Sequence, residues 1–541
     1  MTVNHSAHTP LSFIKKTWLP GTGERGMRII VVLFYVLYLA LGLAISGDYG
    51  ASWDEPLNRD LGQTTLNYVL ARAAGDPVSW AAVSQGLVAE QGPVFETVLS
   101  ALEASLGLQD SRAILQMRHL ATFLAFWLGT IAFYALLRRR FHDRKLALSG
   151  VALLVLTPRL FAHSFYNSKD AVLTALFMVG MLTMLRFVRE QSPAAAVLHA
   201  LACAAAVGIR VVGLLLPAVT LAVLCLHFAG RGSGERNGKR AMAAAGGYVA
   251  LLLLFVYLFW PALWEHPLSS FVHTVSSLAS ARQVDNNFSL YLGSFVRVDR
   301  LPWHYLPVWM IITIPPAILF LFAAGVWTCC RGMLRDLHLS WDNVQNIAFL
   351  LLFFVPVLAV IVMRPVLYDD WRHLYFIYPA CVVIGLTGFR ELCRRPPLST
   401  TAWVLMLLAL LHGAVTVLRS HPYQNVYFNV LAGGDVETRF ELDYWGLSFR
   451  EGLEYVLRTD RSDPVRVAVS DYPGVVNSWL LEGEMRRRLQ IVPLAEADWF
   501  LSNHRQPQYY EDFRARRYPC QNDAYTVRVK GATLLGVYRL R

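Results

Sequence analysis

Two adjacent carboxylates, Asp54 and Glu55, follow the first apolar run of the chain and stand immediately before Pro56. Burying carboxylates at the mouth of a hydrophobic helix is costly, so both are candidates for a general base or for groups that orient a substrate. The alternative is a solvated helix start, in which Asp54 caps the helix that begins near Pro56. The spacing alone slightly favours the cap.

A second polar cluster, residues 163–170, fills a short turn between two apolar runs. Lys169 could hold a phosphate as a point charge, and Asp170 could orient either Lys169 or an acceptor hydroxyl. A mutually satisfied pair of Lys169 and Asp170 at the start of the next helix is equally compatible with the pattern.

A third cluster, residues 364–375, contains Arg372 and His373 as candidate ligands of a lipid phosphate. Asp369 and Asp370 could instead simply neutralise these two bases. Arg210, in a turn between two later apolar runs, is a weaker phosphate candidate, because its side chain could also extend to the membrane surface.

The elements that position these clusters are membrane helices. A bilayer core about 30 Å thick needs about 20 apolar helical residues, since lipid offers no partners to backbone amides. Such stretches number about eleven, several of them close to the minimum length. They cover residues 28–46, 119–137, 146–162, 171–188, 193–208, 211–229, 242–262, 306–329, 346–363, 374–390 and 402–418.

The basic residues set the expected orientation. If the N-terminus is cytoplasmic, the inner loops hold most of the loop bases, as the positive-inside rule requires. The first span has no convincing cleavage site and should remain as an anchor. An odd number of spans then places the C-terminal segment outside the cytoplasmic membrane. The inner bases are Lys15, Lys16, Arg25, Arg138, Arg139, Arg140, Arg144, Lys145, Arg231, Arg236, Lys239, Arg240, Arg394 and Arg395.

Three regions are not lipid-facing. The outer loop 47–116 contains helix-forming stretches that should lie on the membrane, and the outer loop 262–305 should form an interfacial cover over a cavity. In the tail, strand-like apolar runs alternate with helical stretches, which predicts a small α/β domain. The runs are 465–470, 489–493 and 526–540, and the helical stretches are 448–457 and 475–482. We therefore expect a transmembrane catalytic domain over residues 1–418 and an extracytoplasmic domain over residues 419–541.

The composition agrees with an α-helical, multi-span membrane protein. Hydrophobic residues make up 55% of the 541 residues, and charged residues only 16%. The mean hydropathy is +0.40, which excludes a disordered chain and an ordinary cytosolic globule. The net charge of +11 fits bases that anchor loops at the lipid bilayer, so no nucleic-acid partner is expected.

With the three clusters on one side of the membrane, the chain resembles the GT-C superfamily of membrane glycosyltransferases. The branch is that of protein O-mannosyltransferases and bacterial aminoarabinose transferases. The resemblance rests on Asp54 with Glu55, on Lys169 with Asp170, and on the segments 372–379, 429–434 and 443–446.

The resemblance implies a sugar donor carried on a polyprenyl phosphate and an acceptor that is a protein, a lipid or a glycan. Asp54 would be the catalytic base and Glu55 would assist it, with inversion at the anomeric carbon. Asp170 would be a second orienting carboxylate. Lys169, Arg372 and His373, with Arg210 as the weaker candidate, would hold the phosphate. No cofactor is implied; a divalent metal is not needed, although Asp54 and Glu55 could recruit one.

A polytopic transporter or lipid flippase is the main alternative, because it too would have many helices with charged ends. Transporters tend to place ionisable groups near the bilayer midplane and to contain internal repeats. Here the charged clusters lie at one face, and no repeat is evident. A scaffold whose membrane part is only an anchor ranks last, because eleven spans are excessive for that role.

Overall fold

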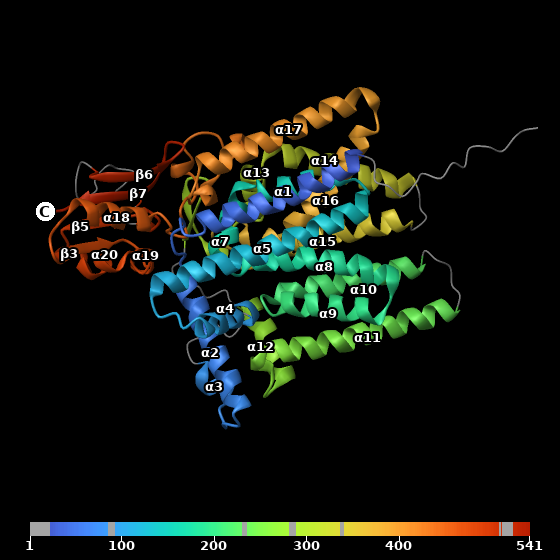
Figure 1. Ribbon diagram of the computed structural model, residues 1–541, viewed down its shortest axis with the longest axis horizontal. Coiled ribbons are helices and arrows are strands. Elements are labelled where there is room, and N and C mark those ends of the chain that lie inside the picture. Colours follow the sequence, from blue (N-terminus) through green and yellow to red (C-terminus); the bar gives the residue numbers. More distant parts are fainter. Residues whose placement is uncertain are drawn as a thin grey trace, which may run out of the picture.

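The computed structural model describes residues 22–84, 92–229, 235–280, 288–335, 340–507, 510 and 523–541. Long helices run side by side along the molecule, and the C-terminal residues form a separate unit at one end of this bundle (Figure 1). We call this the domain-bearing end and the other the opposite end. Lys15, Lys16 and Arg231 lie outside the described residues.

The bundle confirms a multi-pass helical membrane protein. In the described part of the chain, nine helical stretches are long and apolar enough to cross a membrane, or ten if one bent pair is a single span. They are α1 (Thr22–Ile45), α5 (Ser111–Phe141), α8 (Asp170–Glu190), η1 with α10 (Val211–Leu214 and Leu215–Ala229), α11 (Glu235–Phe259), α14 (Pro316–Arg335), α15 (Trp341–Met363), η4 with α16 (Arg372–Ile377 and Tyr378–Cys393) and α17 (Pro396–Arg419).

The count differs from eleven because two of the predicted spans are broken or short. The predicted span 146–162 forms α6 (Arg144–Val155) and α7 (Pro158–Tyr166), which meet at 70°. Pro158 explains the break, since proline ends the hydrogen-bond ladder of the preceding helix and is favoured at a helix start. The predicted span 193–208 is α9 (Pro193–Val207), an apolar helix of only 15 residues.

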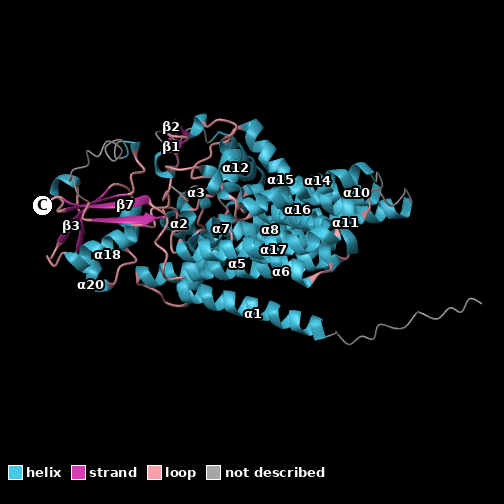
Figure 2. Ribbon diagram, turned by 90° about the horizontal axis from the view of Figure 1, so that it is seen from above, coloured by secondary structure: helices cyan, strands magenta, loops and turns pink. Residues whose placement is uncertain are grey.

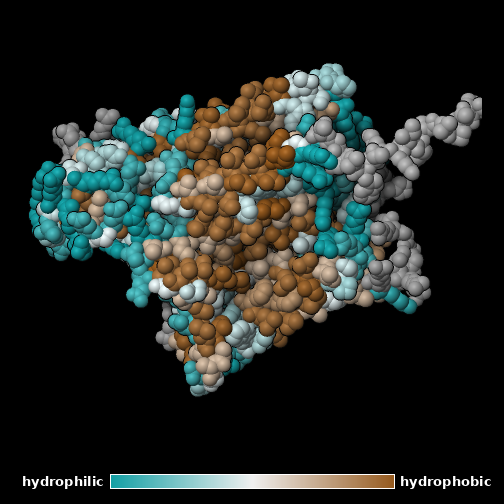
Figure 3. Space-filling model, viewed as in Figure 1, coloured by the Kyte–Doolittle hydropathy of each residue, from teal (hydrophilic) through white to brown (hydrophobic). Residues whose placement is uncertain are grey.

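An apolar belt surrounds the bundle (Figure 3). Brown side chains cover the middle of the helices, and hydrophilic residues gather at the C-terminal unit and at the opposite end. Helix α1 lies along the outside of the bundle, with only 17% of its most apolar window buried (Figure 2). Helices α8 and α16 form the interior, with 72% and 78% of their windows buried.

Both long loops contain regular structure at the domain-bearing end. The first holds α2 (Glu55–Ala73), α3 (Trp80–Val83) and α4 (Val94–Ser105), close to the predicted helical stretches. The second holds η2 (Pro261–Leu263), α12 (Pro267–Ser280), the hairpin of β1 (Phe288–Tyr291) and β2 (Ser294–Arg297), and η3 (Val298–Arg300), before α13 (Tyr305–Thr313). The hairpin was not predicted.

After α17 the chain forms three short 3-10 turns and then a mixed five-stranded sheet. The strand order is β4-β3-β5-β7-β6, with β3 parallel to β4 and β5, and with β7 antiparallel to β5 and β6. The elements are η5 (Gln424–Val426), η6 (Val430–Ala432), η7 (Val436–Thr438), α18 (Phe449–Thr459), β3 (Val465–Val469), α19 (Pro473–Ser478), α20 (Gly483–Arg488), β4 (Leu489–Ile491), η8 (Leu494–Glu496), β5 (Trp499–Ser502), β6 (Tyr525–Val529) and β7 (Ala532–Arg539).

The sheet is joined to the bundle by a continuous hydrophobic core. Side chains from one face of the sheet, such as Val467 and Leu501, belong to the same buried cluster as Phe123 of α5 and Phe165 of α7. Polar contacts reinforce the junction: Asn477 accepts a hydrogen bond from the backbone of Ala51 at 2.9 Å. The C-terminal unit is therefore fixed on the loops that carry the candidate site.

Candidate functional site

The three clusters predicted from the sequence come together at the domain-bearing end. Asp54 lies at the start of α2, Lys169 and Asp170 lie in the α7–α8 turn, and Arg372 begins η4. Together with Arg210, which precedes η1, these residues form what we call the site cluster: Asp54, Lys169, Asp170, Arg210 and Arg372. Its members are linked by the ion pairs and electrostatic contacts described below.

Asp54 is the most accessible carboxylate of the site cluster. It occupies the N-cap position of α2, but its side chain makes no capping hydrogen bond, so the carboxylate is not used as a helix cap. The side chain is 30% exposed, and Oδ2 lies 3.7 Å from Nη1 of Arg372. Its oxygens therefore remain available to another group.

Glu55, the next residue, faces a different environment. Its Oε1 accepts the backbone N–H of Ser52 at 2.6 Å, and its Oε2 lies 3.0 Å from Nε2 of His119 on α5. Both oxygens are engaged, and the side chain is buried. Because Glu55 is the first residue of α2, a rotation of about 100° separates it from Asp54.

Glu55 belongs to a second buried group, which we call the support network: Glu55, His119, Glu96, Arg118 and Ser168. Glu96 of α4 pairs with Arg118 of α5 through Oε2 and accepts the hydroxyl of Ser168 through Oε1. The support network ties α2, α4 and α5 to the turn that carries Lys169.

Lys169 does not pair with Asp170. Its side chain is only 7% exposed, yet its ammonium makes no ion pair or hydrogen bond with any described residue. Burial lowers the pKa of Lys169 to about 8, against the opposing effect of the nearby Asp54 and Glu96 carboxylates. A buried ammonium without a partner is suited to receive an anion.

Asp170 instead pairs with two arginines. Its Oδ1 lies 2.9 Å from Nη2 of Arg210, and its Oδ2 lies 3.2 Å from Nη1 of Arg372. Oδ2 also accepts a hydrogen bond from Nδ2 of Asn167 at 2.9 Å. Asp170 is thus a buried anchor for two cations, and Arg210, with 21% of its side chain exposed, is the more accessible of the two.

Arg372 lies among three carboxylates. Besides Asp54 and Asp170, it donates from Nη2 to Oδ2 of Asp369 at 3.2 Å. Its guanidinium also stacks over the ring of Trp445, 4.4 Å from the ring centroid. The predicted neutralisation of Arg372 by acidic neighbours is therefore present, although by Asp369 and not by Asp370.

Asp370 has its own partners. Its Oδ2 accepts hydrogen bonds from Arg159 at 2.7 Å, Tyr375 at 3.1 Å and Tyr444 at 2.9 Å. Even so, burial raises the pKa of Asp370 above its ordinary value. These contacts hold the 369–372 loop against α7 and the C-terminal segment.

His373, the other predicted phosphate ligand of this loop, has fewer contacts. Its ring lies edge-on to Tyr368, with 4.9 Å between ring centroids, and its buried Nδ1 has no hydrogen-bond partner. It is close to the site cluster because Arg372 precedes it, but among the described residues no hydrogen bond or ion pair joins it to the carboxylates of that cluster.

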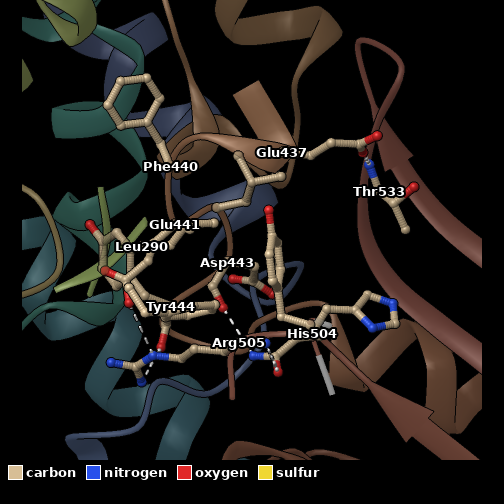
Figure 4. A pocket seen from close by; sticks show the side chains of 13 residues that line it. Leu290, Glu437, Phe440, Glu441, Asp443, Tyr444, His504, Arg505 and Thr533 are labelled. Atoms are coloured by element: carbon tan, nitrogen blue, oxygen red, sulfur yellow. Dashed lines mark hydrogen bonds and ion pairs between the residues drawn. The ribbon is translucent and has the colours of Figure 1, made fainter. Parts of the chain in front are cut away.

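The C-terminal unit contributes Arg505 to this region. Nη2 of Arg505 donates to Oδ1 of Asp369 at 2.8 Å, and Nη1 donates to the carbonyl of Tyr444 at 3.2 Å. Its Nε is 3.8 Å from Oε1 of Glu441. Figure 4 shows Arg505, Tyr444 and Glu441 on one side of a pocket that separates the sheet from the β1–β2 hairpin. Burial raises the pKa of Glu441 to about 7.

Sequence reasoning missed Arg159, Arg505 and Glu441. A signal existed for Arg159, because it is a lone arginine inside an apolar run, and an ionisable residue in a membrane segment indicates a functional site by default. Arg505 and Glu441 lie in polar stretches that resemble any loop, so only the tertiary structure reveals them. Among the described residues, no group of three His, Cys, Asp or Glu side chains could hold a metal ion.

Comparison with solved structures finds proteins of similar overall arrangement. ArnT from Cupriavidus metallidurans, solved with undecaprenyl phosphate, aligns over 94% of this chain and 97% of its own, at 13% identity and a TM-score of 0.48. The archaeal oligosaccharyltransferase AglB from Archaeoglobus fulgidus, solved with an inhibitory peptide and a dolichol-phosphate, aligns over 87% of this chain and 69% of its own. That alignment has 12% identity and a TM-score of 0.46. No curated protein sequence matches the chain.

A comparison with protein families finds a match over part of the chain. Residues 99–260 match the family described as dolichyl-phosphate-mannose-protein mannosyltransferase. This segment runs from α4 to α11 and includes Lys169, Asp170 and Arg210. The match confirms the predicted resemblance to the protein O-mannosyltransferase branch of the GT-C glycosyltransferases over this segment of the chain.

Proposed function

We propose that this protein transfers a sugar, with inversion, from a polyprenyl-phosphate donor to an acceptor hydroxyl at the extracytoplasmic face of the cytoplasmic membrane. The observation that carries the proposal is the presence of two charged groups close to each other. Asp54 is a partly exposed carboxylate without a hydrogen bond from the described residues, and Lys169 is a buried ammonium without an ion pair. They are close enough for Asp54 to affect the pKa of Lys169.

Asp54 would act as the general base. Its carboxylate accepts the proton of the acceptor hydroxyl while that oxygen attacks the anomeric carbon from the side opposite the phosphate. The bond between the anomeric carbon and the phosphate oxygen breaks, and its electron pair stays on the phosphate. The products are the glycosylated acceptor and a polyprenyl phosphate with one additional negative charge.

Lys169 and Arg210 would stabilise that charge. Interactions that strengthen as the phosphate leaves lower the barrier, whereas cations already neutralised by carboxylates contribute less. Arg372 is buried among three carboxylates, whereas Arg210 has one carboxylate partner and is partly exposed. We therefore assign Arg372 to positioning Asp54 and Asp170, with direct phosphate contact left to Lys169, Arg210 and His373. Asp170 would hold the two arginines, and Glu55 would fix the start of α2 through His119.

The orientation is part of the proposal. Arg138, Arg139 and Arg140 end α5, and Arg394 and Arg395 follow α16, all at the opposite end of the bundle. The positive-inside rule makes that end cytoplasmic, so the site cluster and the C-terminal unit would face the other side. The acceptor would then be a protein, lipid or glycan of the cell envelope.

The test is transfer of radiolabelled sugar from a panel of polyprenyl-phosphate sugars, with the purified protein in lipid vesicles. We expect one donor to support transfer, and Asp54→Asn to reduce it about 10²- to 10⁴-fold, because the shape is kept and the basicity is lost. Asp48→Asn is the matched control, since Asp48 is an exposed carboxylate of the same loop whose partner is His421 at 2.9 Å.

Two outcomes would contradict the proposal. Full activity of Asp54→Asn, or an equal loss for Asp48→Asn, would remove Asp54 from the role of base. Movement of intact donor from one leaflet of the vesicle to the other, without sugar transfer to any acceptor, would instead indicate the transporter or flippase alternative.

A further inference from the structure

The opposite end of the bundle contains a groove that the transfer reaction does not use. It lies between the last turns of α5 and α8 and the first turn of α15, and it encloses about 1030 Å³ that is partly open to the surroundings. Four arginines and one glutamate line it, so its charge is strongly positive. Those arginines are Arg138, Arg139, Arg186 and Arg189.

Three of these arginines have no acidic partner in the described part of the chain: Arg138, Arg139 and Arg189. The nearby carboxylates are already occupied. Glu190 pairs with Arg186 at 2.9 Å, and Asp342 pairs with Arg140 at 2.7 Å. The groove therefore presents three cations whose charge is not balanced by the neighbouring carboxylates.

Part of the lining of the groove is apolar. Leu136, Leu182 and Leu185 line it, and Trp341 closes one side, where its ring packs against His227 with 5.0 Å between ring centroids. Figure 3 shows that the apolar belt of the bundle gives way to hydrophilic residues toward this end. Cations next to an apolar wall at the edge of the belt match the two parts of a phospholipid, a phosphate and its acyl chains.

We propose that this groove binds one anionic phospholipid. Its phosphate contacts Arg138, Arg139 and Arg189, and its acyl chains lie against the leucine wall. Basic pockets between membrane helices recognise anionic headgroups in this way, whereas a zwitterionic lipid brings no net charge to balance the cations. The bound lipid would join α5, α8 and α15 at this end, about a helix length from the site cluster.

The experiment is native mass spectrometry of the full chain in a neutral detergent with added phosphatidylglycerol or phosphatidylcholine of the same acyl chains. We expect retention of one phosphatidylglycerol, and a loss of affinity of about tenfold or more in Arg138→Gln/Arg189→Gln. The matched control is Arg25→Gln/Arg28→Gln, which removes two exposed charges from α1 near the same end. This control should bind as the wild type does.

A second variant keeps every charge. Leu182→Trp fills the apolar wall and should also abolish retention, because the acyl chains lose their place while the arginines remain. It tests the proposal even if the double arginine variant fails to fold.

Three outcomes would overturn the proposal. An equal loss of phosphatidylglycerol affinity in both double arginine variants would show that binding depends only on the overall positive charge of this end. Equal retention of phosphatidylcholine would show that the headgroup charge is not recognised. Displacement of the lipid by soluble glycerol phosphate at equal concentration would show that a phosphate alone suffices and that the chains contribute nothing.

Discussion

Two groups of buried charges lie next to each other at the domain-bearing end, and they differ in how completely they are paired. In the support network, all four oxygens of Glu55 and Glu96 have partners among Ser52, His119, Arg118 and Ser168. In the site cluster, the carboxylate of Asp54 accepts no hydrogen bond from a described residue, and the ammonium of Lys169 has no ion pair. The carboxylates of the first group are therefore satisfied within the protein, while the second group leaves a carboxylate and an ammonium for a substrate.

The difference explains how neighbours in the sequence acquire different roles. Asp54 and Glu55 are adjacent carboxylates, and Lys169 and Asp170 are an adjacent cation and carboxylate. In each pair one member is a buried anchor and the other is available to a substrate. Burial alone does not distinguish them, because Lys169 is as buried as its paired neighbours. The useful criterion is whether the surrounding residues satisfy the charge, since an unpaired buried charge is costly unless it has a function.

The largest effect on stability is expected from the support network. Glu96→Gln keeps the shape but leaves Arg118 buried without a countercharge, which should lower the free energy of unfolding by about 3–5 kcal/mol. Thermal melting in detergent measures the loss. The transfer activity per folded molecule should remain when it is assayed well below pH 8, because Glu96 also helps to keep the ammonium of Lys169 charged.

Glu391→Gln is the control for this prediction, because Glu391 and its partner Arg394 have 41% and 65% of their side chains exposed and such pairs contribute little. If Glu96→Gln melts like the wild type but loses transfer, Glu96 belongs to the site cluster and the division between the two groups is wrong.

The membrane architecture could be read from the sequence because each span is a local property. An apolar run of sufficient length predicts a helix wherever it packs, and the clusters at the ends of these runs were visible as polar interruptions. Strands β3 and β4 and helix α18 were likewise predicted from local runs. Strand β5 and the β1–β2 hairpin were missed, because four-residue strands give almost no periodic signal.

The partners of the site residues could not be predicted in the same way. Asp370 meets Arg159, 211 positions away, and Asp369 meets Arg505, 136 positions away. Such contacts depend on how α7 bends and how the C-terminal unit packs, and no local pattern encodes them. The sequence therefore predicted the candidate groups, but not which of them would be neutralised.

A smaller effect, on activity, is expected at Lys169. Lys169→Met should slow sugar transfer about 100-fold, because the leaving phosphate loses a preorganised cation. The pKa of about 8 gives this prediction a pH dependence: the ammonium is present below pH 8 and is lost as the pH rises through it. Wild-type transfer should therefore fall above about pH 8.

Lys169→Arg is the control, since a guanidinium stays charged throughout this range and should remove the alkaline fall while keeping part of the rate. The pH profiles of the three proteins are measured with saturating donor. If Lys169→Arg shows the same loss of rate at high pH, a group other than Lys169 causes that loss. If Lys169→Met transfers sugar at the wild-type rate, Lys169 has a structural role and does not stabilise the phosphate.

The smallest effect is expected at Glu441, which marks the border between the site cluster and the C-terminal unit. Its pKa is raised from 4.5 to about 7, so between these values the folded protein holds a proton that the unfolded chain releases. The free energy of unfolding should accordingly fall as the pH rises from about 4.5 to about 7.

The variant Glu441→Gln tests this expectation, because it cannot release a proton. The difference in melting temperature between variant and wild type should grow across this pH window and be constant above it. The hydroxyl of Ser289 donates to Oε2 of Glu441 at 2.9 Å, and Arg505 lies near Oε1. A constant difference throughout would mean that these two groups keep the carboxylate ionised, which would make Glu441 a fully paired carboxylate like Glu55 and Glu96.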